Sequence, residues 1–234
     1  LIPIFRRSFA KSIEFRSFDK NTNIQESIYD NYIQNGSLFK FLRNDIQDFK
    51  KTSKKYLIPN FSIVKKIRKE LLDRSDDILI GISWKSGSKT DCLSNKKSFE
   101  LTKLAQALNF KRVKLVNLQY GNNVEEFENL KKYQDIKIEN LTSMDIYSDI
   151  DALLSLVAAC DEIVTVDNFI NHLAGAIGKK THVLLPFSCD WRWGINQQKS
   201  YWHRSINLYQ QNNISDWETP LSNLVLELKK SLDL

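Results

Sequence analysis

Asp167 and Asn168 lie where an apolar strand pattern gives way to a helical pattern rich in small residues. The first N–H groups of a helix have no partner within the helix, and the helix dipole places partial positive charge there. This strand-to-helix corner, residues 167–171, suits an anion, which the backbone N–H groups of residues 168–171 would hold. A plain helix cap by the Asp167 carboxylate explains the same residues equally well. The corner therefore predicts either a ligand site or a cap.

A second polar loop, residues 84–97, follows the first predicted strand and carries Lys85, Ser86 and Lys97. A lysine at this position can neutralise negative charge on a phosphate, and the alternative is a solvated loop lysine. The loop lacks the GxxxxGK[ST] spacing of a P-loop, so the sequence does not predict a nucleoside-triphosphate hydrolase.

Other polar or aromatic residues follow the remaining predicted strands. Gln119 and Tyr120 can offer backbone hydrogen bonds and a stacking face, although the glycine after them is also typical of a turn. Residues 190–202 hold three of the five tryptophans, which favours packing against a neighbouring domain over contact with a sugar. His172, in the first turn of a predicted helix, is expected to support neighbouring loops more than to bind a ligand.

From residue 78 onward, short β-branched runs alternate with helical periodicity, which is typical of a parallel sheet covered by helices. We predict an α/β fold with a Rossmann-like, doubly wound parallel sheet in the order 3-2-1-4-5. Its strands are predicted at residues 78–83, 111–118, 136–138, 162–166 and 181–185. Helices are predicted at residues 61–73, 99–108 (capped by Ser98), 123–133, 150–159 (capped by Asp149) and 221–232. Ligands bind where such a strand order reverses, so the loops after the first and fourth strands should meet.

Residues 164–186, VTVDNFINHLAGAIGKKTHVLLP, with the segments DIDALL at 149–154, AACD at 158–161 and DWRW at 190–193, carry a family resemblance. They resemble the nucleotide-sugar-binding domain of GT-B glycosyltransferases, in particular the heptosyltransferase-like family 9. Bacterial members with tetratricopeptide repeats upstream are the most similar by pattern. The likeness runs from about residue 78 to the C-terminus, and a weaker one covers residues 1–48.

The resemblance implies the C-terminal half of a GT-B fold with a remnant of the N-terminal domain. It implies a nucleoside-diphosphate sugar as donor, inverting transfer without a metal or cofactor, and a glycan, lipid-linked or protein acceptor. The donor contacts that it implies are Lys85, Ser86, Lys97, Gln119, Tyr120, Asp167, Asn168, Phe169, Asn171, His172, Trp191 and Arg192. Phe169 departs from the small hydroxylated residues of relatives, so a side-chain contact is lost there.

The general base of such enzymes comes from an early N-terminal loop that this chain does not contain. No catalytic residue is therefore assigned, and we expect the fragment alone to be inactive. The chain starts with Leu1 rather than methionine, which suggests a missing upstream repeat or acceptor domain. We divide it into residues 1–60, the remnant and linker with a short strand at 13–15 and a helix at 38–43, and residues 61–234, the nucleotide-sugar-binding domain.

Composition excludes several other classes. No apolar run reaches the length of about 18 residues that a membrane span needs, and the first residues are too short for a secretory signal. The three cysteines include no CxxC pair, so we expect neither disulfides nor zinc, and a cytoplasmic location. The three histidines are too scattered for a metal site.

A net charge of +6 favours anionic ligands, but the basic residues are dispersed and no RNP, KH or zinc-finger pattern indicates nucleic acid. A nicotinamide-dependent enzyme is disfavoured because no GxGxxG follows the first strand. The alternative that stays open is a non-catalytic nucleotide-sugar-binding or protein-interaction module of a repeat-containing protein.

Overall fold

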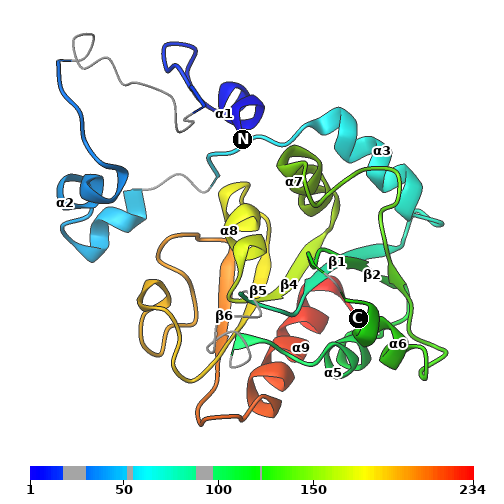
Figure 1. Cartoon of the computed structure of the whole chain (residues 1–234). Helices are drawn as coiled ribbons and strands as arrows, with labels where there is room; N and C mark the ends of the chain where they lie inside the picture. The colour runs from blue at the N-terminus through cyan, green and yellow to red at the C-terminus, as the bar shows by residue number, and fades with distance from the viewer. Residues whose placement is uncertain (18–29, 52–54, 88–96, 122) are drawn as a thin grey trace.

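The computed structural model describes residues 1–17, 30–51, 55–87, 97–121 and 123–234. They form a six-stranded parallel sheet in the order β3-β2-β1-β4-β5-β6, with helices on both faces (Figure 1). The predicted α/β, doubly wound Rossmann-like fold is confirmed, including the order of its first five strands.

Strand bounds agree best with the sequence at the centre of the sheet. β1 (Ile78–Ser83), β4 (Glu162–Val166) and β5 (Thr181–Leu185) have the predicted limits, while β2 (Val113–Asn117) is shorter and β3 (Ile138–Glu139) is shifted. β6 (Ile206–Gln210), the edge strand, was not predicted.

The predicted strand at residues 13–15 is wrong. That segment has no strand partner, and the ring of Phe15 instead packs 5.2 Å from that of Phe5. An aromatic contact with a helix therefore takes the place of a sheet pairing.

Successive side chains of each strand point to opposite faces of the sheet. Leu79 packs under α3 (Phe61–Leu71), α7 (Ile150–Ala159) and α8 (Phe169–Ala176). Ile80 and Ile82 pack on the other face, which is covered by α5 (Leu101–Ala107), α6 (Val124–Leu130) and α9 (Glu218–Leu232). No helix in the described ranges is long and apolar enough to cross a membrane.

The observed starts of α7 and α5 confirm one of the two predicted helix caps and contradict the other. Asp149 caps α7 as predicted, accepting from the N–H groups of Asp151 and Ala152. The predicted Ser98 cap is wrong, because α5 begins at Leu101 without a side-chain cap. The Ser98 hydroxyl accepts instead from the Ser86 N–H, at 3.3 Å, and so closes the loop after β1.

The N-terminal stretch begins with α1 (Ile2–Ser8), which was not predicted. Its Ile4 is fully buried in the same hydrophobic cluster as Ile67 of α3, and Arg7 lies 2.5 Å from the Asp151 carboxylate of α7. The division at residue 60 stays a prediction, while α1 shares the core of the sheet domain.

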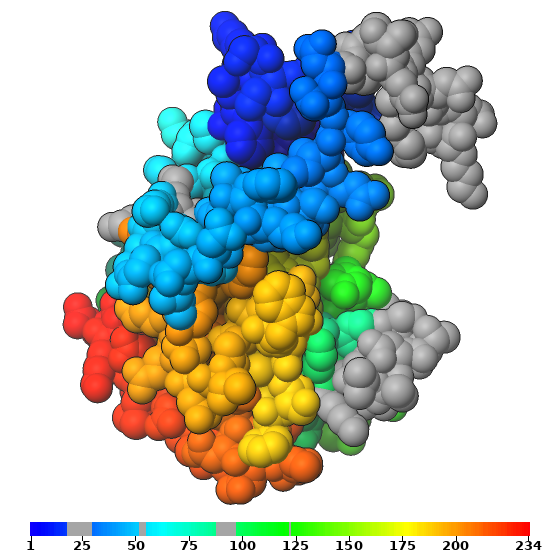
Figure 2. Space-filling view, turned by 90° about the vertical axis from the view of Figure 1, so that its left-hand side faces the viewer, coloured from blue at the N-terminus to red at the C-terminus, as the bar shows by residue number. Residues whose placement is uncertain are grey.

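Residues 35–51 form η2 (Asn35–Leu38), α2 (Phe39–Leu42) and η3 (Ile46–Lys51), which confirms a helix near residues 38–43. Phe39 and Phe49 pack edge-on against Trp202, at 5.1 and 4.8 Å between ring centroids. Figure 2 shows this segment, in light blue, lying over the orange loop before β6.

Candidate functional site

The chain leaves β1 and β4 in opposite directions, and these strands are neighbours in the sheet. Ser83 at the end of β1 is in register with Thr165 near the end of β4. The two loops that follow meet there, as the strand order requires. Lys97 of the first loop places its Nζ 3.0 Å from Oδ2 of Asp167 in the second.

Asp167 is not the cap of α8. Asn168 caps the helix, accepting from the Ile170 N–H at 3.0 Å. The Asp167 side chain, only 5% exposed, is therefore left to bind Lys97. This corrects the interpretation of Asp167 as a plain cap and places its carboxylate at the point where the strand order reverses.

The Asn168 amide ties the two loops together. Its Nδ2 donates to Ser83 Oγ at 2.8 Å and to the Lys85 carbonyl at 3.0 Å, and its Oδ1 also accepts from the Thr165 hydroxyl. With donors and acceptor in use, the side chain of Asn168 can position a ligand only indirectly.

The start of α8 keeps backbone donors for a ligand. Within the part of the chain that the structure describes, the N–H groups of Phe169 and Asn171 make no hydrogen bond. The Asn171 side chain is fully buried and donates to the Val166 carbonyl at 3.3 Å, so it supports the corner from inside. The Phe169 side chain is 44% exposed at the mouth of the corner.

Gln119 and Ser86 shape the loop after β1. The Gln119 side chain, 2% exposed, accepts through Oε1 from the Ser83 hydroxyl and from the N–H groups of Trp84 and Lys85, at 2.7 to 2.9 Å. The Ser86 hydroxyl donates to the Asp167 carbonyl. Both residues lie at the predicted site, where they hold its backbone. Tyr120, 41% exposed, is left at the rim.

Each of the predicted cations has a carboxylate partner. Lys97 pairs with Asp167, and Lys85 pairs with Glu126 of α6. An anion that enters must therefore compete with a carboxylate for either lysine.

His172 packs as a structural residue. Its ring stacks on Trp193 with centroids 5.5 Å apart, and its Nδ1 lies 3.4 Å from Nε2 of His203. Burial, then the nearby charge of Arg192, lowers the pKa of His172. Burial, then His172, lowers the pKa of His203 to about 4.

His203 was not among the predicted site residues, and its position depends on a glycine in α8. A Cβ at Gly175 would lie 2.3 Å from the His203 ring. Glycine at this position therefore makes room for the second histidine.

The loop after β5 borders the same corner. Trp191 is 76% exposed, and Arg192 binds the Asp190 carboxylate through two nitrogens, at 2.9 and 3.1 Å. Burial acts to raise the pKa of Asp190, but hydrogen bonds from Arg192 outweigh it, and Lys97 adds to the lowering. Trp193 is buried within the sheet domain, in a cluster with Val183 and Leu185 of β5, whereas Trp202 packs against Phe49. Packing of this loop against a neighbouring domain stays a prediction.

No group of three or more His, Cys, Asp or Glu residues that could hold a metal ion is found within residues 1–17, 30–51, 55–87, 97–121 and 123–234.

Comparisons with known proteins place this geometry in context. No protein-family profile matches the sequence. FlbA of Caulobacter vibrioides is 25% identical over 239 residues, which cover 98% of this chain and 39% of FlbA.

Two solved structures share the fold. The ADP-heptose LPS heptosyltransferase II of E. coli aligns with a TM-score of 0.56 and 17% identity, over 82% of this chain and 57% of the enzyme. A family 9 glycosyl transferase from Veillonella parvula aligns with a TM-score of 0.50 and 14% identity, over 77% of this chain and 54% of that protein. The chain thus spans little more than half of either structure, and the likeness establishes a fold of the GT-B Rossmann-like kind.

Proposed function

We propose that this chain is the donor-binding part of a glycosyltransferase that uses a nucleoside-diphosphate sugar. The observation that carries the proposal is the Lys97–Asp167 pair where the strand order reverses. It lies beside the N–H groups of Phe169 and Asn171, which have no hydrogen-bond partner among the described residues. The fold shared with two glycosyltransferases supports it.

In the proposed complex the distal phosphate lies at the start of α8, where the backbone donors and the helix dipole favour negative charge. Lys97 turns from Asp167 to the diphosphate and neutralises the charge that develops on the departing nucleotide, in place of a metal. Asp167 then accepts a hydrogen bond from a hydroxyl of the sugar. Tyr120 and Trp191, both exposed at the rim, border the nucleotide and the sugar.

Other features rest on the resemblance in sequence. These are inversion at the anomeric carbon, a glycan, lipid-linked or protein acceptor, a general base outside this chain, and an upstream acceptor or repeat domain.

A second candidate is a non-catalytic nucleotide-sugar-binding module. It is favoured by the pairing of the titratable groups at the described corner, where Asp167 binds Lys97 and His172 packs between Trp193 and His203. Neither group is poised to take a proton from an acceptor hydroxyl. Transfer from a donor to an added glycan by a longer form of the protein would favour the enzyme over the module.

Calorimetry with ADP, UDP and GDP tests the donor site. Each nucleotide is titrated once with EDTA and once with Mg²⁺, and the matching monophosphates serve as controls. We expect one diphosphate to bind with the same Kd in both buffers and at least about tenfold tighter than its monophosphate, because the distal phosphate contacts α8. Binding that needs Mg²⁺, equal binding of mono- and diphosphate, or no binding at all would contradict the proposal.

A further inference from the structure

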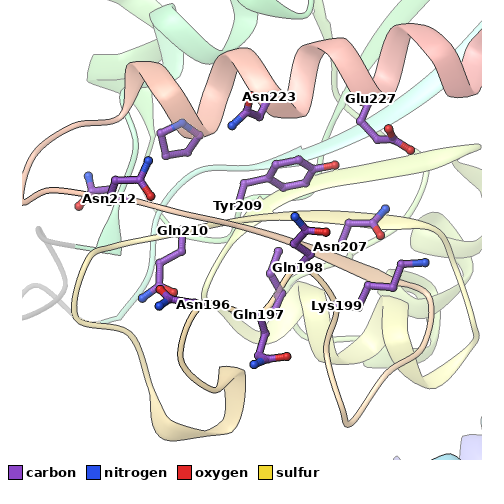
Figure 3. A pocket seen from close by; sticks show the side chains of 13 residues that line it. Asn196, Gln197, Gln198, Lys199, Asn207, Tyr209, Gln210, Asn212, Asn223 and Glu227 are labelled. Carbon is purple, nitrogen blue, oxygen red and sulfur yellow. The ribbon is translucent and has the colours of Figure 1, made fainter.

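A groove of about 660 Å³ runs along the outer edge of the sheet, lined by β6, α9 and the loop before β6 (Figure 3). Its volume lies in the range of small-molecule sites. β6 lies two strands beyond β4 in the sheet order, so the groove is separate from the corner at β1 and β4.

The lining of the groove is polar but nearly uncharged. Eight of its thirteen residues carry side-chain amides, and the two charged ones, Lys199 and Glu227, have opposite signs. Each amide presents donors together with an acceptor, so it can bind a hydroxyl in either sense. This chemistry suits a ligand rich in hydroxyl groups and offers little to a phosphate.

Several of these amides are available. Gln198 in the loop, Asn207 on β6 and Asn223 on α9 make no side-chain hydrogen bond within the described ranges. In Figure 3 the heads of Gln198 and Asn207 lie together below the ring of Tyr209, and Asn223 approaches from the helix above it. The amides thus come from separate elements around one aromatic ring.

The ring of Tyr209 is held in place from behind. Its hydroxyl lies 2.8 Å from Nδ1 of the buried His182, whose Nε2 lies 2.7 Å from the Glu162 carboxylate. The Ser231 hydroxyl of α9 donates to the same carboxylate. A ring fixed in this way is a preorganised platform, so the Tyr209 side chain would lose little conformational entropy when a ligand binds to it.

Addition of a strand from another protein does not fit this edge. The Leu208 N–H donates to the Gln198 carbonyl at 2.9 Å, and the Ser200 N–H donates to the Ile206 carbonyl at 3.1 Å. The loop before β6 therefore occupies backbone groups that an added strand would need.

We propose that this groove binds a neutral oligosaccharide, with one sugar ring against Tyr209 and its hydroxyls hydrogen-bonded by Gln198, Asn207 and Asn223. The site is separate from the proposed donor site, and this proposal does not depend on the proposed function.

Saturation-transfer NMR titrations with maltopentaose, cellopentaose and chitopentaose test the proposal. We compare wild type, the double variant Gln198→Ala/Asn223→Ala, and Asn109→Ala, whose exposed amide lies after α5 and outside the groove. We expect at least one probe to bind, the double variant to weaken it about tenfold or more, and Asn109→Ala to leave it unchanged.

A second variant, Lys97→Gln, separates the groove from the donor corner. We expect it to bind the oligosaccharide as tightly as wild type. Failure of all three probes to bind at millimolar concentration, unchanged binding by the double variant, or loss of binding in Lys97→Gln would overturn the proposal.

Discussion

Lys97 Nζ lies 3.0 Å from Asp167 Oδ2, so this lysine is bound to a carboxylate before any ligand arrives. A phosphate must compete with that carboxylate for the lysine. We therefore expect Asp167→Asn to tighten the binding of a bare nucleoside diphosphate by about three- to tenfold, the range of a partly screened ion pair. Calorimetry in EDTA measures the change. Weaker binding by the variant would mean that Asp167 contacts the nucleotide itself.

The hydrogen bonds of the Asn168 side chain predict an effect on protein stability. Asn168→Asp keeps the oxygen that caps α8 but removes the donors to Ser83 and Lys85. We expect it to lower the free energy of unfolding by about 2 to 3 kcal/mol, because buried acceptors and a new buried charge are left unsatisfied. Asp149→Asn, which alters only the cap of α7, should cost less than about 1 kcal/mol. Urea unfolding that shows equal losses would contradict the role of Asn168 as a tie between loops.

Gly175 and His203 form a pair that a double-mutant cycle can resolve. Gly175→Ala would place a Cβ 2.3 Å from the His203 ring, and we expect a loss of about 1 to 3 kcal/mol in unfolding free energy. In the background of His203→Ala the same change should be nearly neutral, because the ring is gone. Gly36→Ala, with nothing within 4 Å of the added Cβ, is the matched control. Equal costs of Gly175→Ala in both backgrounds would contradict the packing.

His203 makes stability depend on pH. Burial lowers its pKa from 6.5 to about 4 in the folded protein, so the unfolded chain binds more protons between these values. Stability should fall as the pH drops from about 6.5 towards 4, by on the order of 3 kcal/mol, and His172, whose pKa is also lowered, acts in the same direction. Urea unfolding at pH 7.5, 5.5 and 4.5 compares wild type with His203→Gln. A stability difference between the two proteins that stays constant with pH would show that His203 is not the titrating group.

The sequence predicted the buried centre of the fold well. β4 (EIVTV) and β5 (THVLL) are buried at every position and consist mostly of apolar or β-branched residues, which is typical of central parallel strands. β6 (INLYQ) has the alternating pattern of a half-exposed strand. It was not predicted because no turn signal precedes it in the sequence.

At the site, the sequence located the corner but not its internal contacts. Two adjacent residues, Asp167 and Asn168, can each cap a helix, and the extended backbone of Asn168, with φ of −147° and ψ of −173°, decides between them. The carboxylate partner of Lys97 lies 70 residues further along the chain. Such long-range pairs depend on the strand order, so local patterns do not reveal them.

The most direct test of the donor site is the affinity of Lys97→Gln for the nucleoside diphosphate that wild type binds, measured by calorimetry in EDTA. Lys103→Gln is the control, because Lys103 also pairs with a carboxylate, Glu100, but lies exposed on α5. We predict that Lys97→Gln weakens binding about ten- to hundredfold, as loss of a charged hydrogen bond should, and that Lys103→Gln changes it less than about twofold. Wild-type affinity in Lys97→Gln, or an equal loss in Lys103→Gln, would contradict a diphosphate site at β1 and β4.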